Sequence, residues 1–278
     1  MQPVSDSLNV SQPLNVKDES PTGLRWWFND VTLMAQRNIR RMLRSPDLVF
    51  YAVLQPVVFI LLFVYVFGGA MQQIPNMNYK QFLFPGIFVQ TVVFGSVAAT
   101  AIGVAMDMQR GIMDRFLSLP ISSSSVLMGR QFSEIVRNVL LIVVLVVVSL
   151  IVGFRFQGSL ASVLLGMGLL LFFGFAFSWV AALIGLASGS AEAAQSAGIM
   201  WLFPFTFVSS AFVPTSTMPG WLQVYAQHSP ITSMVDTLRI LFNGQPPTSA
   251  IWISLAWSIG ITAVFMPLAI ARFRRGKA

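Results

Sequence analysis

Residues 160–187 read LASVLLGMGLLLFFGFAFSWVAALIGLA and contain no charged side chain. About 20 helical residues, each rising ~1.5 Å, are enough to cross the ~30 Å hydrocarbon layer of a membrane. The stretch therefore predicts a membrane-spanning helix, and five other apolar stretches resemble it. With residues 160–187 as the fourth span, we expect the others at about 48–68, 83–106, 132–152, 193–213 and 251–273. The predicted fold is an all-α integral membrane protein with six transmembrane helices.

The composition supports this class. The chain is 55% hydrophobic and only 10% charged, whereas soluble domains contain roughly 25% charged residues. Because the chain has no cysteine, disulfides and thiolate metal sites are excluded.

The positive charges predict the orientation in the membrane. The formal net charge is +7, which could also indicate nucleic-acid binding, but the basic residues gather at the ends of apolar stretches. Six precede the first span, four follow the second and four end the chain, against Lys80, Arg155 and Arg239 on the other side. Since Lys and Arg beside spans stay in the cytoplasm, we expect both termini there and no nucleic-acid partner.

The region before the first span divides into two parts. Residues 1–23 are polar and mixed in charge, which predicts a disordered cytoplasmic tail ahead of a six-span domain over residues 24–278. Residues 24–44 repeat apolar side chains at helical spacing, with arginines opposite. This pattern is typical of an amphipathic helix in the membrane surface, although a helix docked on protein fits it as well. The predicted interfacial residues are Trp26, Trp27, Arg37, Arg41 and Arg44.

Two regions between spans also contain helical patterns. Residues 107–134 gather charge of both signs, and Ile112, Phe116 and Leu119 share one helical face, which predicts a short cytoplasmic helix that docks on a soluble protein. A solvated loop is the alternative. On the outer side, between the fifth and sixth spans, we expect two short helices in the outer leaflet, starting near Pro219 and Pro230.

The chain carries no recognisable energy source or catalytic site. It has no GxxxxGK[ST] phosphate-binding loop and a single histidine, so we expect no bound cofactor, metal or catalytic residue. We also expect no acidic residue at membrane depth, where ion-coupled carriers hold such groups. Polar residues in or near the spans could line a path or merely bond between helices.

Three stretches resemble the permease subunit of ABC type-2 transporters, most closely the daunorubicin-resistance type of drug or lipid exporter. They are NIRRMLRSPDLVFYAVLQPVVFILLFVYVFGG (38–69), MDMQRGIMDRFLSLPISSSSVLMGR (106–130) and FVSSAFVPTSTMPGWLQVYAQHSPITSMVDTLR (207–239). The resemblance implies a second permease, identical or related, and two separate ATPases that bind ATP and magnesium. It also implies export of a hydrophobic or amphiphilic substrate across a bacterial plasma membrane.

The resemblance assigns roles to individual residues. The coupling helix that contacts the ATPase would contain Arg110, Gly111, Asp114, Arg115, Leu119 and Pro120, and the translocation path would be flanked by Gln55, Gln90 and Pro204. Many relatives have Glu where this chain has Asp107 and Gln109, so the acid that pairs with the ATPase stays open. A carrier driven by an ion gradient is the main alternative, and a channel or a lipid-modifying membrane enzyme would also fit the spans.

Overall fold

The computed structural model describes residues 31–36, 38–40, 46–66, 78–112 and 123–275, and within these ranges the regular structure is entirely helical. This confirms the all-α prediction for the described residues. The helices are α2 (Pro46–Leu61), the π-helix η1 (Leu62–Val66), α4 (Tyr79–Gln109), α6 (Ser123–Val152), α7 (Leu160–Ala187), α8 (Ala191–Phe207), the short 3-10 helix η2 (Thr215–Thr217), α9 (Gly220–His228), α10 (Pro230–Phe242) and α11 (Ser249–Arg275).

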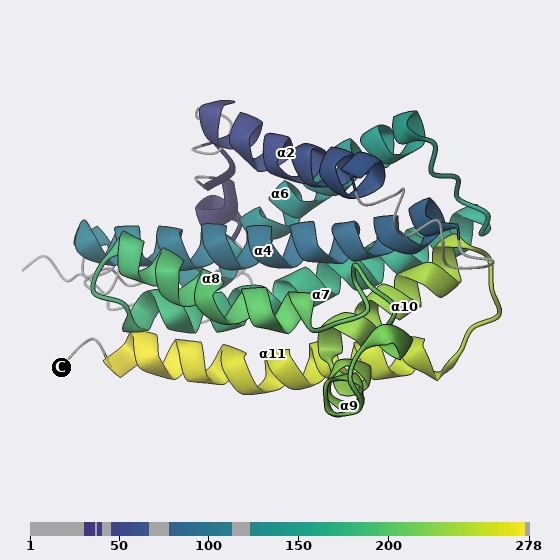
Figure 1. The fold of residues 1–278 in the computed structure, drawn as a ribbon. Helices are drawn as coiled ribbons and strands as arrows, with labels where there is room; N and C mark the ends of the chain where they lie inside the picture. The colour runs from purple at the N-terminus through teal and green to yellow at the C-terminus, as the bar shows by residue number, and fades with distance from the viewer. Residues whose placement is uncertain (1–30, 37, 41–45, 67–77, 113–122, 276–278) are drawn as a thin grey trace, which may run out of the picture.

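Helices α4 and α7 form the centre of the bundle (Figure 1), and the largest buried cluster draws most of its side chains from them. Their close approach depends on small residues. A Cβ atom built on Gly185 of α7 would lie 2.7 Å from the backbone oxygen of Ala101 on α4, and one on Gly174 would lie 2.6 Å from Val92. Around this centre, α11 packs on α7, α8 packs on α4, and α2 lies across α4 and α6.

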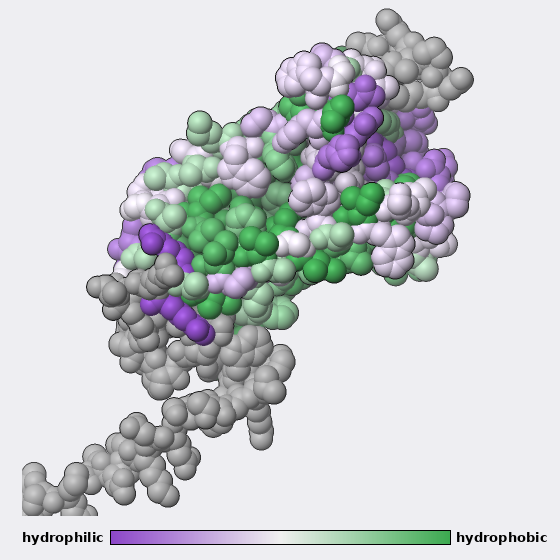
Figure 2. Space-filling view, turned by 90° about the horizontal axis from the view of Figure 1, so that it is seen from below, coloured by the Kyte–Doolittle hydropathy of each residue, from purple (hydrophilic) through white to green (hydrophobic). Residues whose placement is uncertain are grey.

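Four helices in the described part of the chain are long and apolar enough to cross a membrane: α4, α6, α7 and α11. Two of them expose large apolar side chains along their outer faces, including Val143 and Val147 on α6 and Trp252, Ile259 and Val264 on α11. Figure 2 shows one face of the molecule as an area of hydrophobic residues with hydrophilic residues gathered toward its ends. So much exposed apolar surface would be unfavourable in water and is suited to contact with lipid. The chain is therefore a multi-pass membrane protein.

Three of these helices have bounds close to those of the predicted spans. Helix α7 has the predicted bounds of the fourth span, 160–187, while α4 and α11 extend the second and last spans by a few residues at each end. The predicted first span corresponds to α2 continued by η1.

Two helix bounds need correction. Helix α6 begins at Ser123 instead of 132, because two of the charged residues that suggested a loop form ion pairs inside the bundle: Arg130 with Asp107 of α4, and Glu134 with Arg137. Helix α8 ends at Phe207 instead of 213. After it the chain leaves the helical path, since the Ser210 backbone N–H donates to Thr232 Oγ1 (3.0 Å) and that of Ala211 donates to Ser209 Oγ (3.2 Å).

The two short helices expected between the fifth and sixth spans are present as α9 and α10. Pro230 is the first residue of α10, where its missing N–H costs nothing. Gly244 follows the end of α10 with a φ of +67°, a conformation that favours glycine.

Part of the predicted interfacial helix is described. Residues 31–36 and 38–40 are helical, and they lie against α6, because a Cβ built on Gly129 would meet the Met34 Cβ at 2.5 Å and the Val31 oxygen at 2.9 Å. This contact fits the alternative of a helix docked on protein. The tail of residues 1–23 lies outside the described residues, as do Trp26, Trp27, Arg37, Arg41 and Arg44.

Candidate translocation site

A cavity of about 250 Å³ lies between α2, α4, α6 and α8. Its lining combines apolar side chains with amides, a hydroxyl and one guanidinium, so both kinds of surface meet in one space. The lining residues are Gln55, Pro56 and Phe59 of α2, Gln90, Thr91, Phe94, Gly95, Ala98 and Ala99 of α4, Arg137 and Leu141 of α6, and Gln195 and Ile199 of α8.

Helical periodicity brings the α4 residues to the cavity, because positions three and four apart share one helix face. That face carries a glycine and two alanines, which leave the space that larger side chains would fill. Gly95 also admits Arg137 of α6, since a Cβ built there would lie 2.9 Å from Nη1 of the guanidinium.

Hydrogen bonds hold Arg137 in place at the cavity. Its Nε donates to Glu134 Oε2 (2.7 Å), and its Nη2 donates to Asn138 Oδ1 (3.0 Å). Asn138 in turn donates from Nδ2 to Ser96 Oγ on α4 (2.8 Å). The Arg137 side chain is only 15% exposed, and its charged group is held beside the cavity by bonds within α6 and by its close approach to Gly95 of α4.

The same face of α6 continues as a buried polar strip away from the cavity. Arg130 forms an ion pair with Asp107 of α4 (2.8 Å), and the Asp107 side chain is 2% exposed. Gln131 donates from Nε2 to the Ser178 backbone oxygen of α7 (3.3 Å) and accepts a hydrogen bond from the Ser178 hydroxyl. The expectation that the spans hold no acid is therefore wrong for these helices, because Asp107 and Glu134 are both buried on them.

A signal for this strip was present in the sequence. Arg130, Glu134 and Arg137 stand four and three positions apart, and Gln131 and Asn138 stand seven apart. Both spacings place side chains on one face of a helix. The density of charged residues in this part of the sequence suggested a loop instead of a membrane helix. Unpaired ionisable groups are costly inside a membrane, and the sequence alone did not show that these groups are paired.

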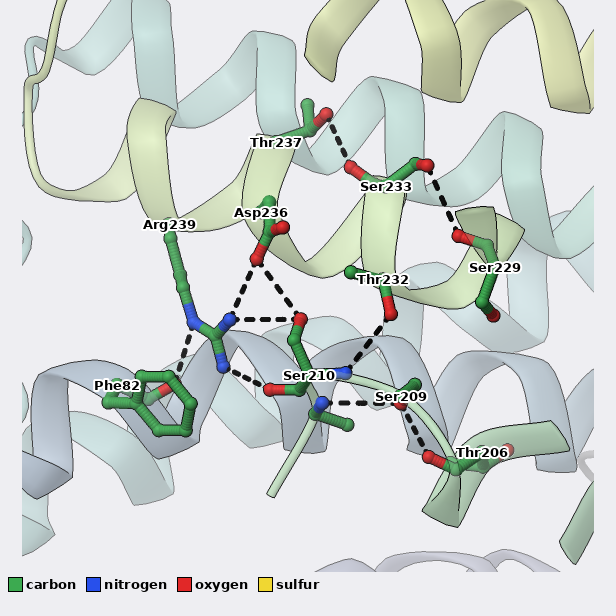
Figure 3. Close-up of polar contacts among 11 residues, drawn as sticks. Phe82, Thr206, Ser209, Ser210, Ser229, Thr232, Ser233, Asp236, Thr237 and Arg239 are labelled. Atoms are coloured by element: carbon green, nitrogen blue, oxygen red, sulfur yellow. Dashed lines mark hydrogen bonds and ion pairs between the residues drawn. The ribbon is translucent and has the colours of Figure 1, made fainter. Parts of the chain in front are cut away.

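A second polar cluster joins α10 to the start of α4 (Figure 3). Arg239 donates to Asp236 Oδ1 (2.8 Å), to Ser210 Oγ (3.0 Å), to the Ser210 backbone oxygen and to the Phe82 backbone oxygen (3.1 Å). Its guanidinium carbon also lies 3.6 Å from the centre of the Phe82 ring. Burial lowers the pKa of Arg239 to about 10, while the charge of Asp236 opposes this shift. Arg239 therefore stays cationic at neutral pH and fixes the segment after α8 to two helices.

The predicted site residues fall into three groups. Gln55 and Gln90, predicted for the path, line the same cavity, while Pro204 lies inside α8 and is not among the lining residues. Arg110 caps the end of α4, and Gly111 follows with a φ of +64° that ends the helix. The remaining predicted docking residues lie outside the described residues: Asp114, Arg115, Leu119 and Pro120. Among the described residues, no cluster of three or more His, Asp or Glu side chains could hold a metal.

Comparison with known proteins identifies the family. The sequence model of the ABC-2 type transporter matches residues 29–243. The chain belongs to this family. The ABC-2 chain is 34% identical over 226 residues to a daunorubicin resistance ABC transporter permease protein of Streptomyces coeruleorubidus, a match that covers 81% of this chain and 79% of the relative. It is 24% identical over 261 residues to a probable doxorubicin resistance ABC transporter permease protein of Mycobacterium tuberculosis, covering 92% of each.

A more distant similarity extends to a probable multidrug ABC transporter permease of Escherichia coli, which is 25% identical over 202 residues, covering 72% of this chain and 54% of the relative. The ABC-2 chain is therefore a membrane permease of an ABC transporter, a transport component. Both the cavity and the Asp107–Arg130 pair lie within the matched region.

Proposed function

We propose that this permease is the membrane-spanning subunit of an ATP-driven exporter, and that it moves a hydrophobic or amphiphilic drug or lipid outward from the cytoplasm or the inner leaflet. The observation that carries the proposal is the cavity between α2, α4, α6 and α8, whose lining combines apolar and polar side chains. The relatives named for daunorubicin and doxorubicin resistance support the same class of substrate.

The cavity suits the two parts of an amphiphile. Phe59, Phe94 and Ile199 offer apolar contact, while Gln90 and Arg137 offer hydrogen bonds. Sites for drug-sized ligands commonly have volumes of about 300–1,000 Å³, so a cavity of about 250 Å³ is small for such a molecule. A drug-sized substrate would enter in a second state, in which α2 or α8 has moved away from α4.

We place six spans in the membrane by adding α2 with η1, and α8, to the four long helices. At ~1.5 Å per residue, residues 46–66 reach about 31 Å and α8 reaches about 26 Å. The distribution of Lys and Arg supports cytoplasmic termini and a cytoplasmic segment between α4 and α6. A second permease, identical or related, would complete the passage, with ATP and magnesium bound by two separate ATPase subunits.

The segment between α4 and α6 is the proposed ATPase contact. Asp107 is engaged with Arg130 inside the bundle, which leaves Asp114 as the acidic candidate in this segment. Exchanging the charges with Asp114→Lys and Arg115→Glu should reduce co-purification of the ATPase. Glu192→Lys is the control, because Glu192 is an exposed acid in the first turn of α8. Equal ATPase recovery from the exchanged and control variants would reject this contact.

Export can be measured in cells loaded with daunorubicin. Cells that express the permease with its ATPase should retain less drug than cells that express either subunit alone. Replacing the phosphate-binding lysine of the ATPase should restore full retention, because the permease has no phosphate-binding loop of its own. Retention that falls equally with the inactive ATPase would contradict ATP-driven export.

A further inference from the structure

We propose that Arg272 and Arg274, at the end of α11, bind the phosphate groups of anionic phospholipids in the inner leaflet of the membrane. The partner is a lipid with a negatively charged headgroup, such as phosphatidylglycerol. This inference is separate from transport, and it takes from the proposed function only the cytoplasmic position of the end of the chain.

The length of α11 places these arginines at the level of the headgroups. Residues 249–271 include no charged side chain, and the helix exposes Trp252, Ile259 and Val264. Tryptophan favours the interface between lipid and water, and Trp252 is 72% exposed. Residues 252 and 272 are 20 positions apart, which corresponds to about 30 Å along a helix, the thickness of the hydrocarbon layer. With Trp252 at the outer interface, Arg272 therefore lies at the inner one.

A buried phenylalanine fixes the direction in which the two arginines point. Phe273 stands between them, is 3% exposed and belongs to the same buried cluster as Val104 of α4 and Trp179 of α7. Arg272 and Arg274 are both exposed. Successive helical residues differ by about 100° around the axis, so the two guanidinium groups extend on either side of the buried ring. Both side chains therefore lie away from the bundle, toward the surrounding membrane.

The protein supplies no countercharge for these two arginines. Among the described residues, neither of them forms an ion pair. The acids Asp107 and Glu134 are buried and paired with Arg130 and Arg137 inside the bundle. A phosphate group would accept charge-assisted hydrogen bonds from the exposed guanidinium groups.

The basic residues on the other side of the membrane donate to the protein's own backbone. Lys80 donates from Nζ to the Val152 oxygen (3.0 Å), and Arg155 donates from Nη1 to the Leu150 oxygen (3.2 Å). The end of α11 differs from these positions in its sequence as well, because residues 272–277 read RFRRGK and contain four cations in six residues. A cluster of four or more Lys and Arg residues directly after a membrane span attracts anionic headgroups.

The test is native mass spectrometry of the full-length chain, released from detergent micelles and titrated with phosphatidylglycerol or phosphatidylcholine. The wild type should bind phosphatidylglycerol more tightly than phosphatidylcholine. The double variant Arg272→Gln, Arg274→Gln should lose roughly thirtyfold in affinity for phosphatidylglycerol, and each single variant roughly fivefold, as expected for two cations and one cation at an anionic surface. Binding of phosphatidylcholine should not change.

Two controls and a soluble probe separate a lipid site from a general effect of charge. The double variant Arg272→Lys, Arg274→Lys keeps both charges and should keep the preference for phosphatidylglycerol. Arg155→Gln removes an exposed cation that already donates to the Leu150 and Phe154 backbone oxygens, and it should leave both dissociation constants unchanged. Glycerol 3-phosphate has the phosphate without acyl chains and should not displace the bound lipid, because apolar contact with α11 contributes to binding.

The proposal is overturned if the wild type binds both lipids equally, or if all three glutamine variants of the α11 arginines keep its affinity for phosphatidylglycerol. An equal loss of affinity in Arg155→Gln would show an effect of net charge alone, and displacement by glycerol 3-phosphate would show a site for soluble anions. Either result would also overturn it. The measurement needs neither ATPase nor ATP, and detergent exposes both ends of the chain, so its failure would leave the proposed transport and orientation standing.

Discussion

Asp107 lies beside the proposed ATPase contact, yet in the structure it forms an ion pair with Arg130 inside the bundle. The variant Asp107→Asn tests whether Asp107 stabilises the fold or contacts the ATPase. Its carboxylate is 2% exposed and lies 2.8 Å from Nη1 of Arg130, which is 14% exposed. Removing one partner of a buried ion pair costs about 3–5 kcal/mol. Asn retains an oxygen acceptor, and Arg130 also donates to the Ala99 backbone oxygen (3.4 Å), so we expect a lower cost of about 2–3 kcal/mol.

Thermal unfolding of the detergent-solubilised chain, followed by size-exclusion chromatography, measures this cost. At about 2–4 °C per kcal/mol, Asp107→Asn should lower the midpoint by about 4–12 °C. Glu192→Gln is the control, because Glu192 is an exposed acid in the first turn of α8, where a carboxylate contributes about 0.3–1 kcal/mol through the helix dipole. ATPase capture well below the midpoint should not change. A wild-type midpoint combined with lost ATPase capture would refute the internal role of Asp107.

Two other substitutions test how the segment after α8 is fixed. Gly86→Ala should abolish or severely reduce recovery of folded protein, because its Cβ would lie 2.0 Å from the Ala211 backbone oxygen. Gly168→Ala is the control and should be recovered like the wild type, because a Cβ at this position meets no atom within 4 Å. Equal yields of the two variants would contradict the close contact between Gly86 and Ala211. Arg239→Lys should lower the thermal midpoint by several degrees, because a lysine cannot reproduce the guanidinium's bonds to several acceptors. The exposed Arg155→Lys should have no effect, and equal midpoints for these two variants would count against the cluster.

The long apolar helices could be predicted because their signal is local. Residues 160–187 are uniformly apolar, and helix α7 has the same bounds. Pro230 and Gly244 likewise act through their own backbone geometry, so the limits of α10 follow from single residues. Features of this kind depend little on what the chain packs against.

The start of α6 and the end of α8 depend on tertiary partners, and sequence reasoning placed both incorrectly. Arg130 resembles a loop residue until Asp107 is brought beside it from another helix. Phe207 ends α8 because the segment after it bonds to α10, through Thr232. For the candidate site, the resemblance to ABC type-2 permeases predicted that Gln55 and Gln90 flank one path, but it did not point to Arg137. The fold brings Arg137 beside α4, and this proximity cannot be read from the sequence.

Transport by the purified components tests the central claim most directly. The chain should be reconstituted into liposomes alone and together with its ATPase, and movement of daunorubicin should be measured with ATP and, separately, with a proton gradient. Daunorubicin should move against its concentration gradient only when both subunits and ATP are present, because the chain has no phosphate-binding loop of its own. Uphill transport by the chain alone, driven by the proton gradient, would contradict the account.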